Sequence, residues 1–154
     1  MAARSPRRPV SVGPTQERRE WTIASDVQAI TPIVETIQAL CAAAGFSPRQ
    51  CRLNIPVAIT EALSNAILRG NASDAARHVR VRVALEGSRL LVDVIDEGAG
   101  FDVQAAQRQP DQPDWLERED GRGYFLMRSL MDQVESRMAD TDGRHTLRLI
   151  LHRT

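Results

Sequence analysis

The sequence predicts an α/β protein of the α+β type, a two-layer sandwich in which helices cover one face of a mixed, mainly antiparallel sheet. Three observations predict this class. Apolar residues recur with a helical period in the first half of the chain, alternating segments over 79–85 and 89–96 indicate a hairpin, and a further helix and two short strands follow. Elements that are apolar on one side bury that side against a second layer, so the helices pack on the sheet.

The length of 154 residues is enough for one domain with a proper core. Residues 1–17 are rich in Arg, Pro, Ser and Gly without any period, which is typical of a disordered tail, and residues 18–154 form the domain. No apolar run is long enough for a membrane helix, and the N-terminus has no signal-peptide pattern. We therefore expect a cytoplasmic protein with no membrane partner.

The charge balance excludes several classes of function. The 20 acidic residues balance 20 basic ones, and every basic residue is arginine. A chain without net charge is not a general nucleic-acid binder, because phosphate-driven binding needs a basic surface. The lack of lysine excludes a P-loop and Schiff-base chemistry. Cys41 and Cys51 lack metal-ligand spacing and the three histidines are scattered, so neither residue type predicts a metal site.

The first elements of the domain are a strand and a helix. Residues 19–24 alternate as a strand, and Ser25 or Asp26 can then cap a helix over 26–44. Gly45 follows the last periodic residue, which predicts that it ends the helix at the C′ position.

A second helix is predicted over 48–68. Ser47 and Pro48 fit its N-cap and first position, and Gly70 stops it. Pro56 falls in its interior, where a missing N–H group kinks a helix or splits it in two.

A hairpin over 79–85 and 89–96 comes next. Its second strand places Val92, Val94 and Asp96 on one face by alternation. If that face is the covered one, the Asp96 carboxylate points inward and needs a partner, because a buried unpaired charge is costly.

The last third of the chain begins with a polar, proline-containing segment over 102–120, which predicts a mobile flap. A helix over 123–132 and strands over 134–138 and 145–151 complete the domain.

Two residues of the second helix suggest phosphoryl-transfer chemistry. Glu61 and Asn65 are four apart and so lie on one helix face. Mg²⁺ prefers hard oxygen ligands and keeps several waters, so one Asn carbonyl plus phosphates can hold it. A carboxylate one turn away is well placed to be a general base. Alone, such a pair is more often part of a solvated helix face. The glycine motifs downstream favour the functional interpretation instead.

Two glycine motifs complete the pattern. Asp96 ends a strand and is followed by Gly98 and Gly100, which let backbone come close to a group held by the carboxylate, such as the exocyclic amine of adenine. Gly121 and Gly123 lead into an apolar-periodic helix, whose free N–H groups attract phosphate. Together the motifs predict a nucleotide held between a carboxylate and a helix start.

The order and spacing of these motifs resemble the ATP-binding domain shared by histidine kinases, type II topoisomerase subunits and MutL, which is the Bergerat or GHKL fold. The resemblance covers about residues 20–152. Glu61–Asn71 looks like the N-box of that fold, Asp96–Phe101 like its G1 box and Gly121–Asp132 like its G2 box. Within the superfamily, the run after the flap and the compact size are most similar to the bacterial anti-sigma-factor serine/threonine kinases.

The resemblance implies ATP and Mg²⁺ as cofactors and a protein serine kinase as the activity. Such a protein binds a sigma factor, phosphorylates a serine of a small anti-anti-sigma (STAS-type) partner and is typically a homodimer. In this reading Glu61 is the catalytic base, Asn65 holds Mg²⁺ and Asp96 accepts from the adenine amine. The other implied contacts are with the base for Gly98, Gly100 and Thr146, and with the phosphates for Gly121 and Gly123.

Three residues depart from the family pattern. Arg69 stands where His is common, Pro56 is unexpected within the N-box helix, and His145 replaces a small residue beside Thr146. None of them removes an essential group.

The sequence is also compatible with three other functions. The chain could be a non-catalytic module that binds ATP as a conformational ligand. It could be a switch kinase that acts in a phosphatase or cyclase pathway without binding sigma, or a detached histidine-kinase catalytic domain.

Overall fold

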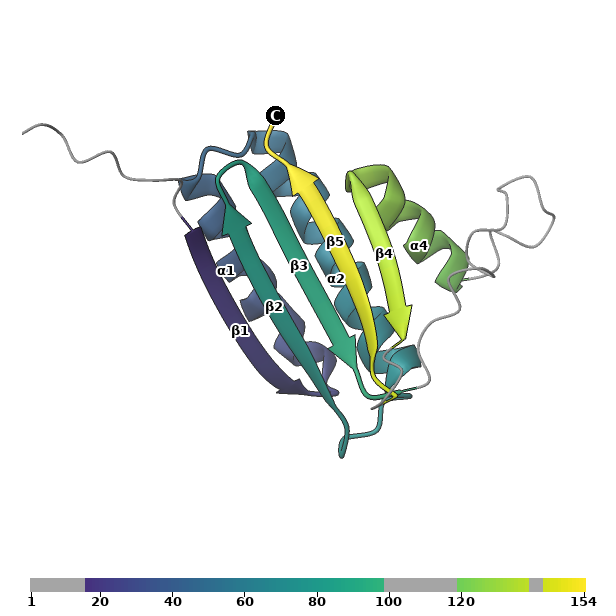
Figure 1. Cartoon of the computed structure of the whole chain (residues 1–154). Coiled ribbons are helices and arrows are strands. Elements are labelled where there is room, and N and C mark those ends of the chain that lie inside the picture. Colours follow the sequence, from purple (N-terminus) through teal and green to yellow (C-terminus); the bar gives the residue numbers. More distant parts are fainter. Residues whose placement is uncertain (1–15, 99–118, 139–142) are drawn as a thin grey trace, which may run out of the picture.

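Five strands form one sheet in the computed structural model, which describes residues 16–98, 119–138 and 143–154. The order across the sheet is β1-β2-β3-β5-β4 (Figure 1). The strands are β1 (Gln16–Ala24), β2 (His78–Glu86), β3 (Arg89–Asp96), β4 (Gln133–Met138) and β5 (His145–His152). Every pairing between these strands is antiparallel. The mixed sheet expected from the sequence is therefore corrected, because β5 runs opposite to both of its neighbours.

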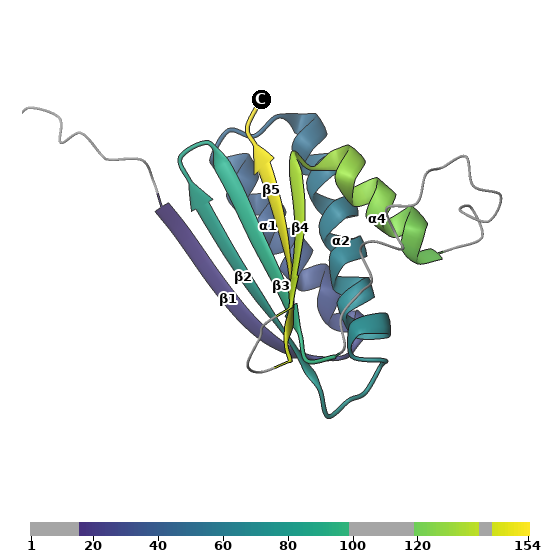
Figure 2. The same ribbon diagram turned by 45° about the vertical axis from the view of Figure 1, so that its right-hand side comes forward.

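The helices lie on one face of this sheet, as predicted (Figures 1 and 2). They are α1 (Ile30–Ala43), α2 (Ile55–Asn65) and α4 (Glu119–Leu130). A short 3-10 turn, η1 (Val27–Ala29), precedes α1, and the wide turns η2 (Gln50–Asn54) and η3 (Ala66–Gly70) flank α2. No helix in the described part of the chain is long and apolar enough to span a bilayer.

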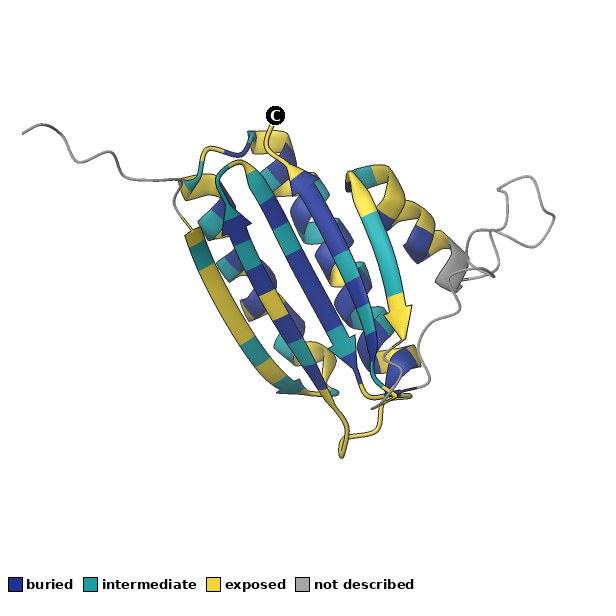
Figure 3. Cartoon of the chain, viewed as in Figure 1, coloured by how far each residue is buried: buried dark blue, intermediate teal, exposed yellow. Residues whose placement is uncertain are grey.

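The core lies between the helices and the sheet. Alternate residues of β2 and β3 are buried, among them Val81, Val83, Val92 and Val94, and they pack against the apolar faces of α1 and α2 (Figure 3). Period-two burial in the strands and one apolar stripe in each helix are what a two-layer sandwich requires.

The predicted cap and C-terminal end of the first helical segment are confirmed, but its first turn is the 3-10 turn η1, and α1 itself begins at Ile30. Asp26 caps η1 by accepting the backbone N–H of Gln28 at 2.9 Å. Gly45 has a φ of 85°, and the N–H of Phe46 donates to the carbonyl of Cys41 at 3.0 Å. A glycine is favoured there because a side chain disfavours that left-handed backbone.

The second helix accommodates Pro56 by a local change of pitch. The N–H of Ile55 donates to the carbonyl of Gln50, five residues back, so η2 is one residue wider than an α-turn. Pro56 then falls in the first turn of α2, where its missing N–H costs little.

Two further predicted boundaries differ from those in the structure. Helix α4 begins at Glu119 instead of residue 123, so Gly121 and Gly123 lie inside the helix and do not precede it. Strand β1 begins at Gln16, so the last two residues of the predicted tail belong to the sheet. The rest of that tail and residues 102–118 of the predicted flap lie outside the described residues.

Candidate functional site

Glu61 and Asn65 lie on the face of α2 that meets α4. Gly123 of α4 is buried at this crossing, and a β-carbon there would be 2.7 Å from Oε2 of Glu61 and 3.4 Å from Nδ2 of Asn65. The glycine therefore lets the backbone of α4 approach both side chains. This close approach brings the predicted G2-box helix next to the predicted N-box residues.

The amide of Asn65 has an unused donor. Its Nδ2 atom is buried and has no hydrogen-bond partner among the described residues. Leaving a buried donor unpaired costs about 1–3 kcal/mol, so a group that supplies an acceptor here would gain that energy. A phosphate oxygen is an acceptor of this kind.

Asp96 ends β3 with its side chain directed toward the helices, as the alternation predicts, and it is only 2% exposed. Its Oδ1 atom accepts the backbone N–H of Gly98 at 3.0 Å. Its Oδ2 atom lies 3.2 Å from Nδ1 of His145, which is the residue opposite it on β5. The other ring nitrogen of His145 is hydrogen-bonded to Oγ of Ser136 on β4. The partner that a buried carboxylate needs is thus His145.

Gly70 and Gly98 bring two backbone segments into contact beside Asp96. A β-carbon on Gly98 would lie 1.3 Å from the carbonyl oxygen of Gly70, and one on Gly70 would lie 2.5 Å from Oδ2 of Asp96. A larger residue at Gly98 requires a backbone shift, and a larger residue at Gly70 requires the Asp96 carboxylate to move. The end of η3 and the loop after β3 therefore form rigid walls around the carboxylate.

Asn71 connects the segments around Asp96 through buried hydrogen bonds. It is fully buried, its Nδ2 donates to Oγ of Ser25 and to the carbonyl of His78, and its Oδ1 accepts the backbone N–H of Glu97 at 2.8 Å. It therefore ties Glu97, just after β3, to the start of β2 and to Ser25, just after β1. The sequence gives Asn71 no role beyond its place at the end of the N-box resemblance, because its hydrogen-bond partners come from distant segments.

A small cavity joins the two halves of the site. It is lined by both Asn65 and Asp96, and its volume of about 10 Å³ is close to that of a single water position. The full lining is Ala62, Asn65, Ala66, Val94, Asp96, His145 and Leu147.

The remaining predicted residues are placed differently. Gly121 lies in α4, and Gly100 lies outside the described residues. Thr146 pairs with Ile95, and strand alternation puts both on the sheet face opposite to Asp96. A contact of Thr146 with the base stays a prediction, and its neighbour His145 is the β5 residue that reaches the carboxylate. That neighbour is visible in sequence only once the register of β3 against β5 is known.

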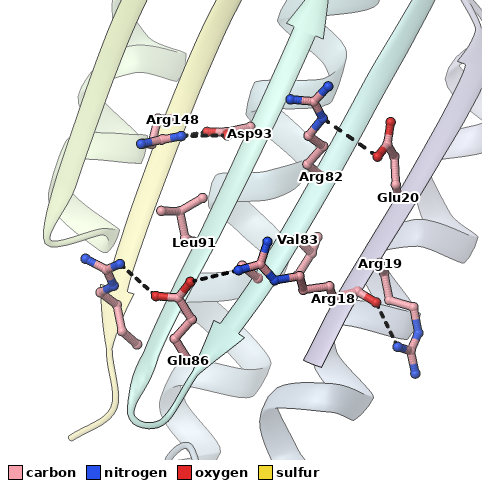
Figure 4. A pocket seen from close by; sticks show the side chains of 11 residues that line it. Arg18, Arg19, Glu20, Arg82, Val83, Glu86, Leu91, Asp93 and Arg148 are labelled. Atoms are coloured by element: carbon pink, nitrogen blue, oxygen red, sulfur yellow. Dashed lines mark hydrogen bonds and ion pairs between the residues drawn. The ribbon is translucent and has the colours of Figure 1, made fainter. Parts of the chain in front are cut away.

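A much larger hollow lies on the open face of the sheet (Figure 4). Its arginines are paired with acids: Arg18 with Glu86 at 3.7 Å, and Arg148 with Asp93 through two bonds of 2.8 and 2.9 Å. The hydrogen bonds that Arg148 donates to the Asp93 carboxylate raise the pKa of Arg148. Because acids neutralise these cations, we do not assign the phosphate site to this face. No group of three or more His, Cys, Asp or Glu in the described part of the chain can hold a metal ion.

Comparison with known proteins gives the family. The family model of the histidine kinase-like ATPase domain matches residues 23–151. The chain is 33% identical over 103 residues to the anti-sigma F factor of Anoxybacillus flavithermus, covering 65% of this chain and 68% of that protein. It is 29% identical over 104 residues to the serine-protein kinase RsbW of Bacillus licheniformis, covering 64% of each. The chain thus spans about two thirds of the length of these relatives.

A solved structure supports the fold independently. The crystal structure of the RsbU and RsbW domains of a Mycobacterium tuberculosis protein superposes with a TM-score of 0.62 at 18% identity, covering 89% of this chain and 32% of that one. The match at this identity concerns the fold alone. The family match covers most of the chain, and we conclude that the chain belongs to the histidine kinase-like ATPase domain family, with anti-sigma F factors and a serine-protein kinase among its relatives.

Proposed function

We propose that this chain is an anti-sigma factor and an ATP- and Mg²⁺-dependent protein serine/threonine kinase. In this proposal it binds a sigma factor, and it phosphorylates a serine of an anti-anti-sigma (STAS-type) partner. The observation that carries the proposal is that Asn65 and Asp96 line one cavity, with Glu61 one helical turn away against Gly123 of α4. Residues from the three predicted motifs therefore meet at one place.

The roles of the residues follow from their chemistry. Asp96 would accept a hydrogen bond from the exocyclic amine of the base, inside the walls made by Gly70 and Gly98. The backbone of α4 around Gly121 and Gly123 would approach the phosphates. Glu61, one turn from Asn65, would take the proton from the attacking serine hydroxyl.

The residues present also fit Mg²⁺. Asn65 offers a side-chain carbonyl oxygen, and its amide nitrogen is a buried donor without a partner in the described structure. One amide oxygen together with phosphates and waters is a sufficient set for this ion. When bound, Mg²⁺ would neutralise charge that develops on the transferred phosphoryl group.

The names of the relatives support the proposed partners. The curated relatives are named anti-sigma F factors and a serine-protein kinase, which supports sigma binding and serine phosphorylation as the pair of activities to test. We propose that the protein is a homodimer, as members of this family typically are, and that it controls transcription in the cytoplasm without touching nucleic acid itself.

Phosphoryl transfer tests the proposal directly. The protein is incubated with radiolabelled ATP, Mg²⁺ and each STAS-type protein of the same genome, and label is expected on a serine of one of them. Glu61→Ala should abolish the transfer but keep ATP binding. Glu35→Ala is the matched control, because Glu35 is an exposed glutamate on the neighbouring helix α1, and it should leave the transfer unchanged.

Other results would point to the other functions. Binding of ATP without label on any partner favours a non-catalytic module. Acid-labile label indicates phosphohistidine and a histidine-kinase domain. Label on a partner without capture of RNA polymerase subunits favours a switch kinase that does not bind sigma.

A further inference from the structure

Both oxygens of the Asp96 carboxylate already have partners. Oδ1 accepts the N–H of Gly98 at 3.0 Å, and Oδ2 lies 3.2 Å from Nδ1 of His145. The side chains of Asp96 and His145 are 4% and 3% exposed. A base amine that reaches Oδ2 therefore has to share this oxygen with the imidazole or displace it.

The cavity that the described residues leave between Asn65 and Asp96 is narrow. Its volume of about 10 Å³ is close to that of one water, so a purine needs additional room beside the carboxylate. Most of its lining has little freedom to move: the methyl side chains of Ala62 and Ala66 have no alternative rotamers, and Val94 and Leu147 belong to β3 and β5 inside the sheet. The backbone of Gly70 closes a further side. His145 is the lining residue whose imidazole contacts Oδ2, and a histidine side chain rotates about its χ1 and χ2 bonds.

Ser136 holds the imidazole in that position. Because the Asp96 carboxylate accepts, the ring proton belongs on Nδ1, and Nε2 is then free to accept the hydroxyl hydrogen of Ser136. The three side chains come from β3, β5 and β4, which are neighbours in the sheet. These hydrogen bonds thus link Ser136, His145 and Asp96 in one series across the three strands.

We propose that His145 is a latch on the base pocket, where its imidazole and the exocyclic amine of an adenine nucleotide compete for Oδ2 of Asp96. The inference rests on the proposed function, since it concerns the same pocket. His145 acts through Asp96, and it sets how much of the protein is open to the nucleotide. The apparent affinity is the intrinsic affinity reduced by the fraction of molecules in which the latch is open.

Calorimetry with ATP and Mg²⁺ tests the latch. His145→Ala removes the imidazole and opens the pocket, so the Kd should fall by about tenfold, the worth of one displaced hydrogen bond. His152→Ala is the matched control: it makes the same change on the same strand, at an exposed position, and should leave the Kd within about twofold of wild type.

A second variant covers the case in which His145→Ala fails to fold. Ser136→Ala keeps the imidazole and removes its anchor, so the Kd should fall by about two- to threefold. Nitrogen-15 NMR of the imidazole gives a readout that a purely structural role would not change. The hydrogen-bonded Nδ1–H of His145 should be seen without nucleotide and should be lost when ATP saturates the protein.

The outcomes separate the latch from the proposed function. Tighter ATP binding by the variants together with loss of the Nδ1–H signal supports the latch. ATP binding by His145→Ala when the wild-type protein binds none also supports it. If wild type binds ATP but the variants bind equally or more weakly, or the Nδ1–H signal persists, the latch is overturned and the proposed function stands. If neither wild type nor either variant binds ATP, both are overturned.

Discussion

Gly123 of α4 lies directly against Glu61 of α2, and a β-carbon at position 123 would be 2.7 Å from Oε2 of that glutamate. The same point is 3.4 Å from Nδ2 of Asn65. The missing side chain therefore sets the position of two groups that the proposed reaction requires, although Gly123 itself carries no reactive atom.

Gly123→Ala should separate activity from stability. Alanine is favoured over glycine inside a helix by about 1 kcal/mol, so unfolding should occur at the same or a higher temperature. The displaced Glu61 carboxylate should lower the rate of phosphoryl transfer by about tenfold or more. Arg128→Ala, at an exposed position on the same helix, should change neither quantity. Full activity in Gly123→Ala would show that the contact with Glu61 is not needed for the reaction.

Gly98→Ala should destabilise the protein strongly. Its β-carbon would lie 1.3 Å from the carbonyl oxygen of Gly70, so the backbone must move, and we expect a loss of about 3 kcal/mol in the free energy of unfolding. Gly143→Ala is the comparison: it has open space around it but a φ of 69°, so it should lose only about 1 kcal/mol. Chemical denaturation measures both, and equal losses would contradict the close contact.

Cys41 should make stability fall at high pH. Burial raises the pKa of its thiol to about 12, from an ordinary value of 9.0. Between those values the unfolded chain loses the proton and the folded chain keeps it, so the free energy of unfolding decreases by up to about 1.4 kcal/mol per pH unit. This contribution is fully present below pH 9 and is lost as the pH rises toward 12.

The variant Cys41→Ala should lack that part of the pH dependence. Denaturation of both proteins between pH 8 and 11 measures the difference, after correction for the smaller side chain with the value at pH 8. Parallel curves would show that the thiol ionises as easily in the folded protein as in the unfolded chain.

Local signals explain which elements the sequence could predict. The end of α1 needs only Gly45 and the residues around it, and the hairpin of β2 and β3 needs only alternation and a turn, so both are confirmed. The predicted start of α4 is too late, because the first residues of the helix are polar and include two glycines of low helix propensity. Packing of α4 on α2 at Gly123 accompanies the earlier start.

The site could be predicted as a set of residues but not as a geometry. The spacing of four residues predicts that Glu61 and Asn65 lie on one helix face. Strand alternation predicts that Asp96 points inward, and Asp96 is buried. The contact of Asp96 with His145 depends on the register between β3 and β5, which are 49 residues apart in sequence at this point, and no local pattern encodes that register.

Nucleotide binding by Asp96→Asn tests the central claim most directly. Calorimetry with ATP and Mg²⁺ should show binding by wild type and by Asp93→Asn, a control on the same strand but on the opposite face, paired with Arg148. Asp96→Asn should bind at least about tenfold more weakly, because an amide accepts the base amine less well than a carboxylate. Equal affinity in Asp96→Asn, or no heat from the wild-type protein, would contradict the account.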